Sequence, residues 1–129
     1  MTLTGDISSM LAGTVPLADR SPDTAQDDID AAFAVVAETS QSKVFVGSFA
    51  GKSGWERHEN GDELVHVLEG KTELTVLLGK LKEVSSLRAG MVAIIPVGLW
   101  HHFDAPDGVT ILTATPMPTE HYPGDLPGT

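Results

Sequence analysis

From residue 40 onward, apolar and β-branched residues gather in short runs that glycines interrupt. We expect strands over residues 43–49, 62–68, 72–78, 91–95 and 109–114. The glycines fall mostly between these runs, where tight turns need positive φ values that β-branched residues resist. Several short strands at close spacing predict an all-β barrel or sandwich built from antiparallel hairpins.

The two ends of the chain have different patterns. Residues 1–25 mix Thr, Ser, Gly, Asp and Pro around scattered apolar residues, which predicts an irregular arm with one short edge strand at most. From Asp27 to Glu38, apolar residues recur at helical spacing behind an acidic first turn, so we expect a short helix, with a strand as the alternative. The proline-rich tail, residues 115–129, is expected to run over the surface as an extended strap.

Length and composition favour one domain. With 129 residues and 41% hydrophobic content, residues 1–129 are expected to form a single unit with a strand core at about 43–114. The net charge of -10 opposes binding to nucleic acid or to anionic membrane surfaces. Without cysteine, any metal must take nitrogen and oxygen ligands. No apolar run has the length of a membrane span, and we expect a soluble cytoplasmic protein.

Two segments carry residues suited to metal binding. In a strand, Glu56 and His58 project to the same side. A turn at Asn60-Gly61 would return the chain so that Glu63 stands across from them, with Val65 and Val67 on its face. Later, a rigid Pro-x-Gly turn at residues 96–98 delivers His101 at the start of the next strand, with Phe103 facing the same way.

Two imidazoles with a carboxylate and open positions form the ligand set of non-haem iron oxygenases. The same nitrogen and oxygen set accepts manganese, nickel or zinc. The residues therefore predict a divalent-metal site without choosing among these ions.

These motifs resemble those of the cupin family over roughly residues 43–114. The first cupin motif ends in Glu, six residues, Gly; the second runs Gly, five residues, Pro-x-Gly, two residues, His. The matching positions here are Glu63 and Gly70 for the first motif, and Gly90, Pro96-Val97-Gly98 and His101 for the second. The resemblance implies a cupin-type antiparallel β-barrel, also described as a double-stranded β-helix or jelly roll.

The resemblance also implies that His58, Glu63 and His101 are metal ligands. Glu56 stands where the family has its first histidine. It either supplies a further oxygen ligand, or turns away and serves as general base. Two other departures are Gly51, one place late for the first glycine, and Ala105, where the final asparagine would stand.

The remaining histidines have ordinary interpretations. By strand alternation His66 lies opposite Glu63 and His102 opposite His101, which favours packing or interface roles. His121 in the tail is expected to be a solvated surface residue. Arg57 should point outward and pair with Glu59.

Three hypotheses for function follow. The first is a metal-dependent enzyme of dioxygenase, isomerase or decarboxylase type, acting on a small molecule between the apolar walls Val65, Val67, Ile95 and Phe103. The second is a non-catalytic module that binds a small ligand or metal. The third is an inert barrel in which the histidines and carboxylates only satisfy one another.

The expected strand around Glu63 has apolar residues on both faces. Leu64, His66 and Leu68 alternate with Val65 and Val67, so a second surface needs covering. Together with the cupin resemblance, this predicts a homodimer.

Overall fold

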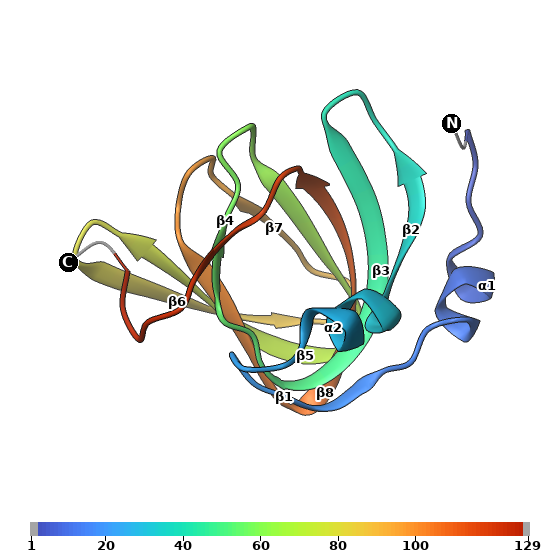
Figure 1. The fold of residues 1–129 in the computed structure, drawn as a ribbon, viewed down its shortest axis with the longest axis horizontal. Helices are drawn as coiled ribbons and strands as arrows, with labels where there is room; N and C mark the ends of the chain where they lie inside the picture. Colours follow the sequence, from blue (N-terminus) through green and yellow to red (C-terminus); the bar gives the residue numbers. More distant parts are fainter. Residues whose placement is uncertain (1–2, 128–129) are drawn as a thin grey trace.

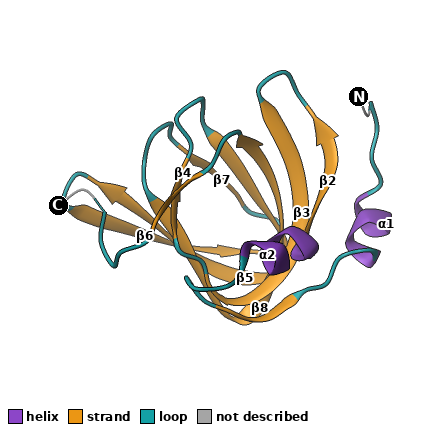
Figure 2. Ribbon diagram, in the orientation of Figure 1, coloured by secondary structure: helices purple, strands orange, loops and turns teal. Residues whose placement is uncertain are grey.

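The protein is built mainly from β-strands, with helices confined to the N-terminal part (Figure 2). The computed structural model describes residues 3–127, so the first two residues of the expected arm and the last two of the tail lie outside the described residues. The elements in order are α1 (Ile7–Ala12), β1 (Leu17–Arg20), α2 (Gln26–Ala32), β2 (Phe33–Glu38), β3 (Ser42–Lys52), β4 (Trp55–Arg57), β5 (Glu63–Leu78), β6 (Leu81–Arg88), β7 (Val92–Ile95), β8 (His101–Pro116) and β9 (Glu120–Tyr122).

The strands join in one hydrogen-bonded sheet that curls into a barrel, seen nearly end-on in Figure 1. Strands β5 and β8 are its centre: each has 16 residues, and they pair antiparallel along most of their length. β3 continues the sheet on β8, while β6 and β7 pair with the two halves of β5. The expected all-β, cupin-type barrel is therefore confirmed.

Strand β5 combines two segments that the sequence pattern predicted as separate strands. The predicted strands 62–68 and 72–78 are halves of one long strand, and the register to β8 shifts between Val67 and Glu69 and again between Gly70 and Glu73. Gly70 has φ +74°, and a Cβ there would collide with the carbonyl oxygen of Gly108. The glycine between the runs therefore marks a bend within a strand, since only glycine fits that close approach.

The hydrophobic core fills the inside of the curled sheet. Along the start of β5, Glu63, Val65 and Val67 are buried, whereas Leu64, His66 and Leu68 are half-buried on the other face. The core cluster consists of Phe49, Val65, Val67, Leu74, Leu87, Ile95, Phe103, Ala105, Val109 and Ile111. This alternation is the one expected for a sheet with one packed face.

The N-terminal part differs from its prediction. The helix expected from Asp27 to Glu38 ends at Ala32, and the second half is strand β2, antiparallel to β3. Pairing with β3 satisfies the backbone groups of this β-branched segment and buries Val36, which explains why the alternative prevailed. The arm contains the expected edge strand, β1, and also a helix that was not expected, α1, which the Asp6 side chain caps by accepting from Ser9 N at 2.9 Å.

Strand β4 pairs differently from the prediction. The expected hairpin across Asn60-Gly61 is wrong, because β4 pairs with β8 and β9 instead of β5. The tail is likewise more than a strap, since β9 brings it back onto β4.

Strand β6 had not been expected because, apart from Leu87, its residues are exposed and carry no apolar alternation. The β5–β6 hairpin extends to one side of the barrel (Figure 1).

Membrane crossing by a helix has no support in the structure. Neither helix within residues 3–127 combines the length and the apolar character that such a span requires.

Candidate metal centre

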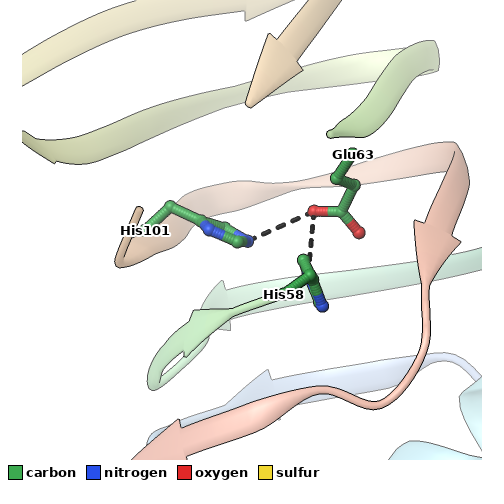
Figure 3. Close-up of side chains that lie close together, drawn as sticks. All are labelled: His58, Glu63 and His101. Carbon is green, nitrogen blue, oxygen red and sulfur yellow. Dashed lines mark ion pairs between the residues drawn. The ribbon is translucent and has the colours of Figure 1, made fainter. Parts of the chain in front are cut away.

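Three buried side chains from separate segments converge inside the barrel (Figure 3). His58 follows β4, Glu63 begins β5 and His101 begins β8. Glu63 Oε1 lies 3.3 Å from His58 Nε2 and 3.2 Å from His101 Nε2. The three side chains offer ligand atoms that all lie within 4.8 Å of one another, and the residues are only 1–5% exposed.

Backbone hydrogen bonds tie the two sequence motifs together. Gly98 N donates to the carbonyl oxygen of His58 at 2.9 Å, and Val97 N donates to Asp62 Oδ1 at 2.9 Å. Gly98 has φ +78°, a conformation that glycine adopts without strain. The Pro-x-Gly turn thus positions the backbone of the first motif as well as His101.

Each of the three side chains also makes a polar contact with a residue outside the cluster. His101 Nδ1 lies 3.1 Å from the carbonyl oxygen of Leu99, which can only accept, so the proton of a neutral ring sits on Nδ1 and the Nε2 lone pair faces the centre. His58 Nδ1 contacts Thr119 Oγ1 at 3.2 Å. Glu63 Oε2 accepts a 2.5 Å hydrogen bond from Thr115 Oγ1. These contacts fix the orientation in which Nε2 and Oε1 converge.

Glu63 Oε1 is the unusual atom of the cluster. It is buried and has no hydrogen-bond partner among residues 3–127, although the Nε2 atoms of both imidazoles lie within 3.3 Å of it. A buried carboxylate oxygen without a partner is costly. The nitrogen lone pair of neutral His101 faces this same oxygen, an arrangement that a cation bound between them would stabilise. The donor set and the unpartnered oxygen both fit a divalent metal.

The protonation of the cluster reflects the same proximity. Burial alone raises the pKa of Glu63, but the polar contacts and positive charge of His101 and His58 outweigh it and lower that pKa to about 2. Burial lowers the pKa of His101, yet the adjacent Glu63 outweighs this and raises it, with a further contribution from Glu56. In the metal-free protein, the carboxylate and a protonated His101 therefore stabilise each other.

The cluster opens into a cavity of about 560 Å³. Its apolar lining residues are Ile29, Phe33, Val35, Phe45, Phe103, Ile111, Met117 and Pro118. Of the walls expected from sequence, only Phe103 is correct; Val65, Val67 and Ile95 belong to the packed core instead. Half of these residues come from α2, β2 and β3, which the sequence pattern had not placed over the site.

Glu56 lines this cavity but lies outside the three-residue group. Its side chain is 19% exposed, and Oε1 lies 3.8 Å from Nη2 of Arg20. The Glu56 side chain is therefore oriented toward Arg20, which also lines the cavity.

The other histidines mostly follow the predictions. His66 is half-buried on the face opposite Glu63, and His102 packs edge-on against Trp55 with ring centroids 4.4 Å apart. His121 is exposed as expected, but β9 carries it to the cavity, which it lines. Arg57 forms the expected ion pair with Glu59, at 2.8 Å.

Sequence reasoning missed several residues of the site. Thr115, with Thr113 hydrogen-bonded to it at 2.7 Å, was placed in the expected tail, one residue beyond the predicted strand 109–114, whereas β8 continues to Pro116. Arg20 and Thr119 carried no signal, because Arg20 lies in the arm that was expected to be irregular and Thr119 in the tail that was expected to be a surface strap.

Comparison with known proteins agrees with the fold and the motifs. The family model described as Cupin domain matches residues 48–114, about half of the chain. The chain belongs to the cupin family. No curated protein sequence matches it.

Solved structures of the same fold include a cupin-2 domain containing protein, a dioxygenase and a decarboxylase. A cupin-2 domain containing protein from Shewanella frigidimarina is 25% identical, with a TM-score of 0.58 over 66% of this chain and 79% of that one. Hydroquinone 1,2-dioxygenase from Sphingomonas, with 4-hydroxybenzoate bound, is 17% identical, with a TM-score of 0.63 over 88% of this chain and 73% of that one. Oxalate decarboxylase from Bacillus subtilis, which has Mn(II) centres, is 15% identical, with a TM-score of 0.53 over 65% and 29%.

Proposed function

We propose that this cupin binds a divalent metal through His58, Glu63 and His101 and acts as an enzyme on a small organic molecule held in the adjoining cavity. The observation that carries the proposal is the buried Glu63 Oε1, which has no hydrogen-bond partner in the described chain and lies between two imidazole nitrogens. Iron, manganese, nickel and zinc all suit this nitrogen and oxygen set.

A metal held there would supply a Lewis acid that polarises oxygen atoms of a bound molecule. The chain's own residues supply the surroundings. Thr115 and the Leu99 carbonyl orient two of the ligands, and apolar walls such as Phe33 and Phe103 limit water in the cavity. Glu56, outside the ligand group, is the wall carboxylate available to accept a proton from a bound molecule.

The reaction class within this proposal is dioxygenase, isomerase or decarboxylase. Proteins of the same fold named as a dioxygenase and a decarboxylase support it by analogy, since one scaffold hosts many reactions. The second candidate is a binding module without catalysis. The position of Glu56 favours this alternative, because its Oε1 lies toward Arg20 Nη2, at 3.8 Å, and outside the three-residue group.

Elemental analysis of protein purified without a metal-affinity column tests the metal site. We expect close to one equivalent of iron, manganese, nickel or zinc, and its loss in the His58→Ala, His101→Ala double variant. His66→Ala is the matched control, since His66 is half-buried on the opposite face and should keep the metal. Protein that contains no metal and takes none up on titration would exclude the proposal.

We also propose that the protein forms a homodimer through the outer face of β5 and β7. Val92 and Ile94 on that face are 54% and 56% exposed, beside half-buried Leu64 and His66. Burying such a patch is favourable. Light scattering should give twice the monomer mass, and Val92→Lys with Ile94→Lys should give a monomer that remains folded. A wild-type monomer at high concentration would contradict the dimer.

A further inference from the structure

A second polar group faces the cavity besides the metal cluster. Arg20, at the end of β1, is 8% exposed, and its side chain lines the same cavity as His58, Glu63 and His101. Its guanidinium lies over the ring of Phe49, 4.6 Å from the centroid, and 5.5 Å from the centroid of Phe33. The two aromatic rings hold the flat cation in place.

The hydrogen-bonding capacity of Arg20 is largely unused. Nε is buried without a partner within residues 3–127, and the Glu56 carboxylate stands 3.8 Å from Nη2, beyond hydrogen-bond distance. A guanidinium has five N–H donors in a planar fork that matches a carboxylate. A buried arginine without close hydrogen bonds is costly unless a ligand supplies the acceptors.

The charges around the inner cavity favour an anion once a divalent metal is bound. Arg20 contributes one positive charge, and Glu56 and Glu63 contribute two negative charges. With a divalent metal on the cluster, the balance is one positive charge, which a single carboxylate would neutralise. Asp30 also lines the cavity, but it is exposed at the surface and holds Gln26 Nε2 at 2.8 Å.

We propose that Arg20 binds the carboxylate of a small organic acid whose apolar body packs against Phe33, Phe45 and Ile111. This inference names the substrate class of the site. The charge balance rests on the proposed metal, whereas the contact between Arg20 and the carboxylate does not. An organic acid is favoured over an inorganic anion because the cavity walls are mainly apolar.

Fluorine NMR titration with para-fluorobenzoate and its neutral isostere para-fluorobenzamide tests the inference on the full chain, both chelator-treated and zinc-loaded. We expect the zinc-loaded wild type to bind the acid about tenfold more tightly than the amide, and the metal-free wild type to keep a smaller preference for the acid, because the Arg20 fork contacts the carboxylate in both states. Arg20→Met should bring the two within about twofold. Arg57→Met is the matched control: Arg57 lies outside the cavity, on Glu59 and Glu120, and its loss should leave the preference unchanged.

Two further variants keep the test decisive if Arg20→Met does not fold. Arg20→Lys should retain only part of the preference, because an ammonium lacks the planar fork. Glu56→Gln should strengthen binding of the acid, since it removes the competing carboxylate. Three results would each overturn the inference. They are equal binding of acid and amide by the metal-free wild type, a preference for the acid that survives Arg20→Met, and weaker binding of the acid by Glu56→Gln. Absence of zinc uptake would refute the metal proposal alone, because the metal-free titration tests Arg20 separately.

Discussion

At the scale of single residues, the site depends on how Glu63 is oriented. One carboxylate oxygen is taken by Thr115, which leaves the other to face the imidazoles. A carboxylate without this contact could rotate and lose the position that both nitrogens share. The hydroxyl of Thr115 therefore contributes to the metal site without being a ligand.

Replacing Thr115 with valine should weaken metal binding. The side chain keeps its shape but no longer donates to Glu63 Oε2, so we expect a loss of about tenfold in affinity. Competition against a chelator of known affinity measures it. Thr110→Val, on the same strand, is the matched control, because Thr110 contacts only the hydroxyl of Ser48, at 2.7 Å, among the side-chain hydrogen bonds described. Equal affinity of Thr115→Val and wild type would show that the hydroxyl does not orient the ligand.

At the scale of elements, the two longest strands, β5 and β8, approach each other closely at Gly70 and Gly108. Gly70 in β5 lies against the backbone of Gly108 in β8, and this approach lets both strands bend while they stay paired. The bend separates the half of β5 that carries Glu63 from the half that pairs with β6. The geometry of the site therefore depends on a contact between two backbones.

Gly70→Ala should lower the free energy of unfolding by about 3 kcal/mol, since the new methyl group meets backbone atoms and φ is positive. Gly79→Ala provides the control: φ is +62° there, but nothing lies within 4 Å of the added Cβ. It should cost only about 1 kcal/mol. Urea denaturation measures both variants. Similar losses at the two positions would mean that φ alone matters and the close approach does not.

At the scale of the whole molecule, the buried cluster links stability to pH. The folded-state pKa of Glu63 is lowered to about 2, so in the metal-free protein its contribution is fully present above its ordinary value of 4.5 and is lost as pH falls toward 2. The pKa of His101 is raised, so its contribution is fully present below its ordinary value of 6.5 and is lost as pH rises through the higher folded-state value. Both contributions are complete only between these two ordinary values.

The metal-free wild type should therefore be most stable, relative to Glu63→Gln, between about pH 4.5 and 6.5. The pKa shift of Glu63 corresponds to a difference on the order of 3 kcal/mol in this window. Urea unfolding of chelator-treated protein from pH 3 to pH 9 measures it. A difference between the two proteins that does not change with pH would contradict the predicted coupling.

Much of the fold and three residues of the candidate site follow from local pattern. Alternating β-branched runs with intervening glycines predicted an all-β barrel, and the spacing of Glu63 to Gly70 and of Gly90 to His101 carried the cupin resemblance, which the family match confirms. His58 was predicted from strand alternation with Glu56 and from the cupin resemblance, and the structure brings it to within 3.3 Å of Glu63. Such features are visible in sequence because strand periodicity and turn geometry act over a few neighbouring residues.

What tertiary structure decided are contacts between distant segments. Phe33 to Glu38 became a strand because β3 offered its backbone an edge, although its apolar spacing suits a helix. Glu56 was drawn to Arg20, 36 positions earlier in the chain, and not into the group of His58, Glu63 and His101. Thr115 reached Glu63 across 52 positions. Sequence spacing carries no information on such contacts, because the curling of the whole sheet, and not any local preference, brings their residues together.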